Sequence, residues 1–129
     1  MKPLPTKKGL EAMKLLIADD SAFLRQQLIH MITELTGIKD IEQAEDVPTA
    51  IEAIRKEKPD VVVLDIRMPG GSVIDVLKKV QKEDHRPVFI VFTNYSYPRF
   101  RKSCLAAGAD FFLDKSFDQN ELLGLLKKL

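Results

Sequence analysis

The stretch VVVLDIRMPGG, residues 61–71, decides the fold. It begins with four consecutive apolar residues, reaches Asp65, and ends in a Pro-Gly-Gly turn signal. A continuous apolar run of this length is typical of a strand buried on both faces, as in the centre of a parallel sheet. VFIVFTN (88–94) has the same form and reaches Thr93. The sequence therefore predicts two central strands that each end in a polar residue.

The remaining chain alternates between short apolar runs and segments with helical spacing. Further strands are expected at KLLIA (14–18), IEQAE (41–45) and FFLD (111–114). Helices are expected at 21–36, 47–57, 73–83, 97–107 and from 118 onward. This order predicts an α/β fold of five βα units, with a doubly wound parallel sheet and helices on both faces. Its ligand crevice should lie at the carboxyl ends of the strands.

Local signals support three of the helices. In 21–36, Ser21 can cap the start and Gly37 the end, and one face carries the apolar residues Leu24, Leu28, Met31, Ile32 and Leu35. Asp46 is expected to cap the second helix. The last begins with D-Q-N-E (118–121), a pattern that indicates a capping box.

Composition narrows the class of protein. The 129 residues suit one domain, 45% are hydrophobic, and 20 Lys and Arg against 19 Asp and Glu leave a formal charge of +1. A net charge this close to zero gives the protein no overall electrostatic field that would attract nucleic acid or an anionic membrane. The single cysteine, Cys104, excludes an internal disulfide, and no apolar run is long enough to span a bilayer. We expect a cytoplasmic domain at residues 13–129 after a flexible leader at 1–12.

Five chemically active side chains should meet at the carboxyl edge of the sheet. They follow four different strands and are Asp19, Asp20, Asp65, Thr93 and Lys115. Any one could be an ordinary turn or surface residue. Together, carboxylates, a hydroxyl and an ammonium suit Mg²⁺ binding and phosphoryl transfer to a carboxylate. The adjacent carboxylates Asp19 and Asp20 repel each other, so either a cation lies nearby or the pair sits in water.

Four motifs resemble the receiver domain of two-component response regulators, the CheY-like family. They are ADDS (18–21), LDIRMPGG (64–71), VFTN (91–94) and GADFFLDKS (108–116), and the resemblance covers residues 13–129. It implies a flavodoxin-like strand order of 2-1-3-4-5. It also implies a signalling domain rather than an enzyme, in which Asp65 accepts a phosphoryl group from a sensor histidine kinase or phosphotransfer protein and slowly hydrolyses it.

The resemblance also implies a metal site. Mg²⁺ would be held by Asp20, Asp65 and the main-chain carbonyl of Arg67, with Asp19 acting through water. Of the remaining site residues, Thr93 would bond one phosphoryl oxygen after phosphorylation.

The family's switch implies a second set of residues. Lys115 would pair with another phosphoryl oxygen, and Phe112 lies where the family places an aromatic that rotates on activation. The responding surface would be the fourth helix, fifth strand and fifth helix, about 97–128, where Tyr97, Phe100 and Arg101 are the residues of interest. This surface could bind an unknown downstream partner or form a homodimer.

Three positions depart from the family pattern. Ser116 replaces a proline after Lys115, so a trans peptide bond is expected there. Val73 replaces a glycine, so that turn should be rebuilt or already helical. Asn94 is larger than the usual residue after the switch threonine, and with Arg67 it could alter the lifetime of the phosphate.

Other functions have less support. A haloacid-dehalogenase-like phosphatase needs a second aspartate where Arg67 stands, and a flavodoxin-like carrier needs a phosphate loop where DDSAF (19–23) stands. A phosphorylation-independent docking module with the receiver fold is the main alternative. Whether the chain is a stand-alone receiver or part of a longer regulator stays open. His30 and His85 are expected to have no catalytic role, and Cys104 is expected to pack inward. The basic residues Arg99, Arg101 and Lys102 are expected to be solvated helix surface and not a nucleic-acid site.

Overall fold

A computed structural model describes residues 9–129. Residues 1–8 of the expected leader lie outside this range. The rest of it, Gly9 to Ala12, includes one turn of 3₁₀ helix, η1 (Leu10–Ala12), from which Leu10 packs on the core.

The sheet has five parallel strands in the order β2-β1-β3-β4-β5. This confirms the α/β fold and the strand order expected from the sequence. The strands are β1 (Lys14–Ala18), β2 (Asp40–Ala44), β3 (Val61–Leu64), β4 (Val88–Thr93) and β5 (Phe111–Asp114). β2 lies one residue earlier than expected. β3 and β4 are buried along their whole length, as their continuous apolar runs predict.

Each strand is followed by a helix. These are α1 (Ala22–Thr36), α2 (Val47–Glu57), α3 (Val73–Gln81), α4 (Pro98–Ala107) and α5 (Gln119–Lys128). Side chains of Ser21 and Asp46 cap α1 and α2, and Gly37 ends α1 in the left-handed conformation at φ 82°. These caps satisfy amides that the first turn leaves without partners.

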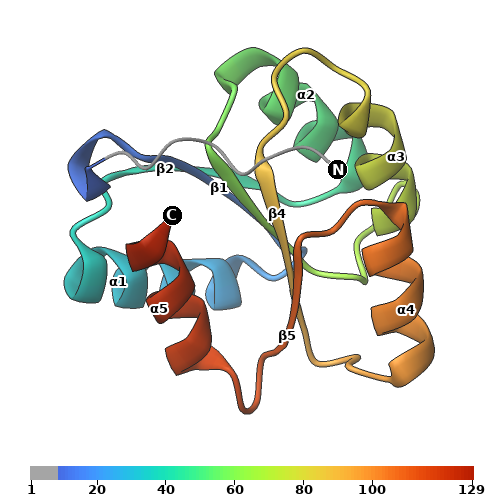
Figure 1. Cartoon of the computed structure of the whole chain (residues 1–129). Coiled ribbons are helices and arrows are strands. Elements are labelled where there is room, and N and C mark those ends of the chain that lie inside the picture. The colour runs from blue at the N-terminus through green and yellow to red at the C-terminus, as the bar shows by residue number, and fades with distance from the viewer. Residues whose placement is uncertain (1–8) are drawn as a thin grey trace.

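The helices form two layers around the sheet. α2, α3 and α4 cover one face and α1 and α5 cover the other, as Figure 1 shows. Two apolar clusters result, one with Phe89 and Phe112 and the other with Ile32 and Phe92. No helix among residues 9–129 combines the length and apolarity needed to cross a membrane.

The apolar face expected in α1 is only partly buried, and the cap expected for α5 was wrong. In α1, Ile32 is buried, but Leu24 and Leu35 are 39% and 55% exposed, because α5 covers only part of the predicted apolar face. The capping box at 118–121 does not form. The Asp118 carboxylate instead accepts a hydrogen bond from the main-chain N–H of Asp114, 2.8 Å away, and so closes the turn before α5.

The turn before α3 is already helical at Val73, as expected. Val73 is the first residue of the helix and is buried, and Ser72 and Asp75 form a capping box around it. The positive φ that a turn here requires falls instead on Gly70, at 85°, and Gly71, at 143°.

Candidate functional site

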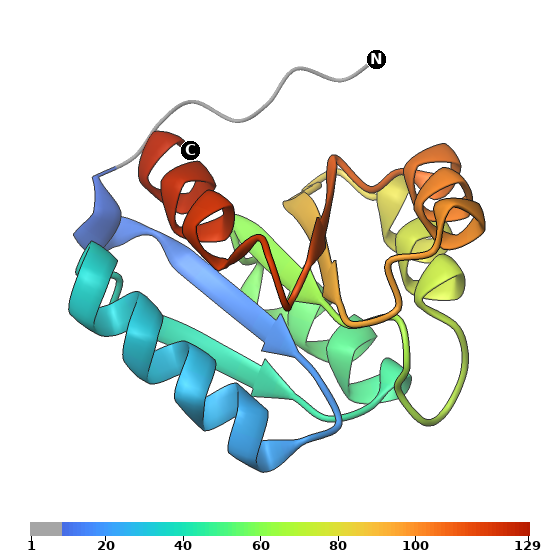
Figure 2. The ribbon, with the colours of Figure 1, turned by 90° about the horizontal axis from the view of Figure 1, so that it is seen from below.

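Main-chain hydrogen bonds position the site at the carboxyl edge of the sheet. Beyond the strands, the N–H of Asp19 donates to Ala44 and that of Asp65 to Ala18, both at 3.0 Å, and the N–H of Lys115 donates to Thr93 at 2.9 Å. The parallel ladder therefore continues one residue past β1, β3 and β5. Figure 2 looks onto this edge, where the loops after β1, β3, β4 and β5 meet.

The Lys115 ammonium lies between two carboxylates. Its Nζ donates to Asp19 Oδ2 at 2.5 Å and to Asp65 Oδ2 at 2.9 Å, and all three side chains are at most 14% exposed. Burial alone lowers the pKa of Lys115, but the hydrogen bonds to Asp19 and Asp65 outweigh it, and its pKa is raised above the ordinary lysine value. Lys115 is therefore held as a cation.

The Thr93 hydroxyl holds the other oxygen of Asp65. It is completely buried and donates to Asp65 Oδ1 at 2.9 Å, while its own oxygen accepts from the N–H of Tyr95 at 3.1 Å. Asp65 thus has one oxygen bonded to a hydroxyl and the other to an ammonium. Its carboxylate is fixed in orientation before any ligand arrives.

The two adjacent carboxylates have different surroundings. Asp19 is buried against Lys115, whereas Asp20 is exposed. Asp19 therefore has a cation nearby, as one alternative required, and Asp20 faces water, as the other required. Asp20 lies with Arg67, Met68 and Phe100 around a hollow of about 650 Å³. A second hollow, of about 400 Å³, has Asp19, Asn94 and Lys115 in its walls.

The donors suit a hard cation, but an ammonium lies among them. Asp19, Asp20 and Asp65 supply the carboxylate oxygens that Mg²⁺ prefers. Among residues 9–129, however, no three His, Cys, Asp or Glu side chains are grouped in a metal-ligand arrangement. Lys115 occupies one oxygen each of Asp19 and Asp65. The three carboxylates are chemically suited to Mg²⁺, and a bound ion would share those of Asp19 and Asp65 with Lys115.

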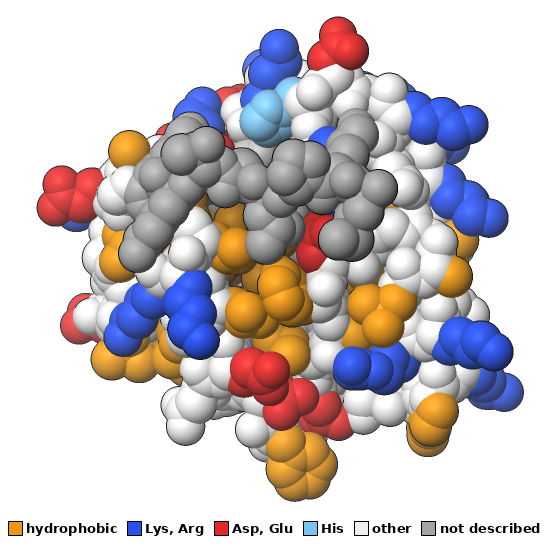
Figure 3. All heavy atoms as spheres, viewed as in Figure 1, with side chains coloured by type: hydrophobic (Ala, Val, Ile, Leu, Met, Phe, Trp, Pro, Cys, Tyr) orange, Lys and Arg blue, Asp and Glu red, His pale blue; other side chains and the backbone are white. Residues whose placement is uncertain are grey.

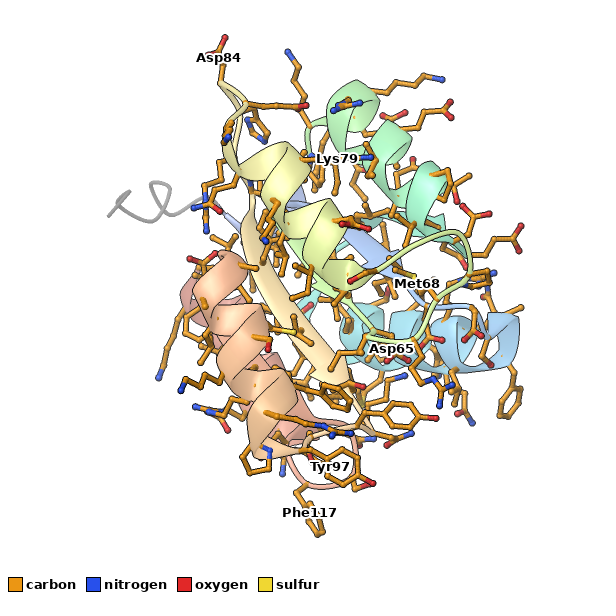
Figure 4. The ribbon with its side chains drawn as sticks, turned by 90° about the vertical axis from the view of Figure 1, so that its right-hand side faces the viewer. Asp65, Met68, Lys79, Asp84, Tyr97 and Phe117 are labelled. Carbon is orange, nitrogen blue, oxygen red and sulfur yellow. The ribbon has the colours of Figure 1, made fainter. Side chains whose placement is uncertain are left out.

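Phe112 is buried in the larger cluster, with 5% exposure. The guanidinium of Arg101 lies over its ring at 6.0 Å and donates to its main-chain carbonyl at 3.1 Å. Tyr97, which Figure 4 labels, is 58% exposed and meets the edge of the Phe100 ring at 5.7 Å. The surface expected to respond thus combines buried Phe112, half-buried Phe100 and exposed Tyr97 with the Arg101 cation.

The turn after Lys115 is organised by Asp114. Its carboxylate accepts hydrogen bonds from the Ser96 hydroxyl and from the N–H of Ser116, the latter at 2.7 Å. The hydrogen bond from Ser96 is the main reason that the pKa of Asp114 is lowered. All peptide bonds in the described residues are trans, which confirms the expectation for Lys115–Ser116. The loop after β4 is thereby tied to the loop after β5.

Acidic side chains gather beside this turn at the lower centre of Figure 3, with an apolar group projecting below them. Figure 4 shows Phe117 projecting from the same lower end of the molecule, and it is 85% exposed.

Three residues of this edge were not predicted from the sequence: Tyr95, Ser96 and Phe117. Tyr95 contacts Arg67, and Ser96 contacts Asp114. The signal that could have indicated Tyr95 is its place two residues after Thr93, in the loop that leaves the site. The other residues noted from sequence lie elsewhere. His85 is at the opposite edge, where Nε2 lies 2.8 Å from the carbonyl of Pro59.

Cys104 faces inward from α4, as expected, with 2% exposure. Burial raises the pKa of its thiol to about 11. The basic residues Arg99, Arg101 and Lys102 are exposed on α4.

The fold and the residues at its carboxyl edge define a class: doubly wound α/β proteins that hold a carboxylate between a hydroxyl and an ammonium. Comparison with known proteins is consistent with this class. The family described as "Response regulator receiver domain" matches residues 15–127. The chain belongs to this family, the receiver domains of two-component signalling.

Relatives include both short and long proteins. Chemotaxis protein CheY of Thermotoga maritima is 32% identical over 116 residues, which are 90% of this chain and 96% of that protein. A protein-glutamate methylesterase/protein-glutamine glutaminase of Xanthomonas campestris is 41% identical over 95 residues, 73% of this chain but only 27% of that protein. A Bacillus subtilis sensory transduction protein, LytT, is matched over 47% of its length. The chain thus spans half or less of these two longer relatives.

Solved structures agree with the fold. The signal receiver domain of the putative response regulator NarL from Mycobacterium tuberculosis superposes with a TM-score of 0.82 at 25% identity, over 92% of this chain and 95% of that one. The response regulator domain of Thermotoga maritima CheB superposes with a TM-score of 0.75 at 26% identity, over 90% and 94% of the two chains.

Proposed function

We propose that Asp65 accepts a phosphoryl group from a sensor histidine kinase or a phosphotransfer protein. The observation that supports this is the pair of hydrogen bonds that orient its carboxylate, from Thr93 at 2.9 Å and Lys115 at 2.9 Å. Both donors can pass to phosphoryl oxygens once Asp65 is modified, so the groups that orient the nucleophile also neutralise the product. The cytoplasmic location expected from the sequence remains a prediction.

The transfer replaces one bond to phosphorus with another. An oxygen of Asp65 attacks the phosphorus of a phosphohistidine, a P–O bond forms, the N–P bond breaks, and its electron pair stays on the imidazole nitrogen. Lys115 is suited to stabilise the charge that spreads over the phosphoryl oxygens, because its two present acceptors already hold it as a cation. Thr93 would keep its hydroxyl proton and act as a donor only.

Mg²⁺ would be held by Asp20, Asp65 and the carbonyl of Arg67, with Asp19 acting through water. When bound, the ion supplies positive charge that offsets the repulsion between the carboxylates and an incoming phosphoryl group. Lys115 would then be freer to leave Asp19 for the phosphoryl group.

The proposed output is a change in the surface formed by α4, β5 and α5. Phosphorylation adds roughly one to two negative charges next to Thr93 and Lys115. Movement of these residues would pull on the loop after β4 and on Phe112, which Arg101 now holds inward. The altered surface would bind a downstream protein, an output domain or a second copy of the chain.

The test is phosphorylation by acetyl phosphate with Mg²⁺, followed by intact mass. Wild type should gain one phosphate, and Asp65→Asn should gain none. Asp84→Asn is the matched control, because Asp84 is an exposed aspartate at the far end of the molecule in Figure 4. If wild type gains no phosphate and an NMR titration with beryllofluoride, a phosphoryl mimic, gives no response, the proposal fails in favour of a phosphorylation-independent docking module.

A further inference from the structure

A further hollow lies between the C-terminal ends of α3 and α4, at the edge of the sheet opposite to Asp65. Its volume is about 860 Å³, and its walls include Lys78 and Lys82 of α3, Leu105 of α4, and Arg86. Arg86 comes two residues before β4 begins, so the hollow borders the edge where the strands start, whereas Asp65 lies where β3 ends. We call this hollow the α3–α4 groove.

The inner wall of the groove is fixed by an ion pair. The Arg86 guanidinium donates from Nη1 to Asp110 Oδ2 at 3.0 Å and from Nη2 to the main-chain carbonyl of Gly108 at 2.7 Å. Asp110 Oδ2 also accepts from the N–H of Phe89 at 2.9 Å, and both charged side chains are at most 20% exposed. Because these two charges offset each other, this wall is rigid before any partner arrives and adds little net charge.

The outer wall is positively charged. Lys78 and Lys82 are exposed and four residues apart, so they lie on the same side of α3. Within residues 9–129, neither has a carboxylate at ion-pair distance. α4 contains no acidic residue, and Asp75 of α3 is used in the capping box at the other end of that helix. Figure 3 accordingly shows Lys and Arg side chains along the right-hand edge of the molecule, where Figure 1 places α3 and α4.

The α4 side of the groove is apolar. Leu105 is 37% exposed, and Ala109 beside it is buried. An exposed leucine side chain gains free energy when another apolar group covers it. The groove is therefore cationic along α3 and apolar along α4.

We propose that the α3–α4 groove is a docking site for an acidic segment of a partner protein. Two carboxylates spaced by about one helical turn would pair with Lys78 and Lys82, and an apolar side chain beside them would cover Leu105. The proposal rests on charge complementarity. It goes beyond phosphoryl transfer and does not depend on modification of Asp65, because the two sites lie at opposite edges of the sheet.

An acidic peptide fits this groove better than the phosphates of a nucleic acid. α3 and α4 both end here, so the negative ends of two helix dipoles lie beside the lysines, and the Asp110 carboxylate lies in the wall. Nucleic-acid binding relies on many cation–phosphate contacts, and the formal charge of the chain is only +1. A peptide offers main-chain N–H groups as well as carboxylates, so it can complement both signs of charge.

The probe is a fluorescein-labelled peptide of about 12 residues, roughly three helical turns, with Glu residues four apart and a Leu between them. A peptide with Gln in place of Glu and a single-stranded oligonucleotide of similar length are compared with it. Fluorescence anisotropy measures the affinity, and amide chemical shifts of the full chain locate the site, expected at residues 78–82 and 105–110. The Gln peptide should bind about four- to 25-fold more weakly, because each exposed ion pair contributes about two- to fivefold.

Variants of the protein test the same contacts from the other side. The double variant Lys78→Gln, Lys82→Gln should weaken binding of the Glu peptide by about four- to 25-fold, and Leu105→Ser by about three- to tenfold. Lys79→Gln is the matched control, because Lys79, labelled in Figure 4, is exposed on the same helix but does not line the groove. It should change the affinity by less than about twofold. Thermal unfolding shows that each variant is folded.

Saturable binding at these residues, weakened in the double variant and kept in Lys79→Gln, supports the docking site. Absence of saturation up to about 1 mM peptide, or an equal loss in Lys79→Gln, overturns it. Tighter binding of the oligonucleotide than of the peptide, lost in the double variant, also overturns it and assigns the groove to nucleic acid. The test uses unphosphorylated protein, so none of these outcomes bears on the proposed function of Asp65.

Discussion

Replacing Lys115 with methionine would test how strongly the ammonium holds the site together. Lys115→Met keeps much of the side-chain volume but removes both hydrogen bonds, at 2.5 Å to Asp19 and 2.9 Å to Asp65, and leaves two nearly buried carboxylates without their shared cation. Breaking a buried charge pair costs about 3–5 kcal/mol. Because these side chains retain 8–14% exposure, water can partly replace the ammonium, and we expect a loss of about 2–3 kcal/mol.

Urea unfolding at neutral pH measures this loss, which should lower the midpoint by about 1–2 M. Lys127→Met, at an exposed position on α5, is the control and should change stability by no more than about 0.5 kcal/mol. Because the pKa of Lys115 is raised in the folded state, its contribution is complete below the ordinary value of 10.5 and declines as the pH rises through the higher folded value. A loss below about 1 kcal/mol in Lys115→Met would refute the role assigned to this pair of hydrogen bonds.

Three other experiments test separate features of the structure. Thr93→Val removes the buried hydroxyl that donates to Asp65 and should lower the free energy of unfolding by about 1–3 kcal/mol in urea titrations. Cys104, with its pKa raised to about 11 from 9.0, should hold about a hundred-fold less thiolate in the native protein than in unfolded protein, so maleimide labelling should be slow until urea is added. Gly70→Ala should destabilise by about 1–3 kcal/mol, because φ is 85° and a Cβ would lie 2.7 Å from a proline side-chain carbon. Gly124→Ala, in open space on α5, should instead stabilise by about 0.5–1 kcal/mol in thermal unfolding.

Each of these expectations could be contradicted by a specific result. Full stability in Thr93→Val would mean that water satisfies Asp65 there, and rapid labelling of native Cys104 would mean that α4 opens readily. Equal effects of Gly70→Ala and Gly124→Ala would contradict the left-handed turn before α3.

Much of the candidate site was predictable because strand ends are local features. The apolar runs that end at Asp65 and Thr93 predict both the strands and the edge at which their side chains meet. The conformation at Val73 was predictable for a similar reason, since a β-branched residue disfavours positive φ. The roles of the site residues remain predictions.

Contacts between distant loops were not predictable. Nothing local to Tyr95 indicates that Arg67 will stack on it, because the contact depends on how the loops after β3 and β4 leave the sheet. The exposure of Leu24 has the same cause: helical spacing identifies an apolar face, but only the position of α5 decides how much of that face is covered. The Asp118 carboxylate likewise binds the amide of Asp114 because the turn brings it there.

The sequence by itself determined the alternation of strands and helices, the burial of the central strands, and the polar residue at the end of each. These depend on periodicity and on residues adjacent in the chain. Only the tertiary structure decided that Lys115 would join Asp19, 96 residues away, to Asp65 while Asp20 faces water. This arrangement depends on the order of β1, β3, β4 and β5 across the sheet. That order brings the Lys115 ammonium within reach of the Asp19 and Asp65 carboxylates but not of the Asp20 carboxylate.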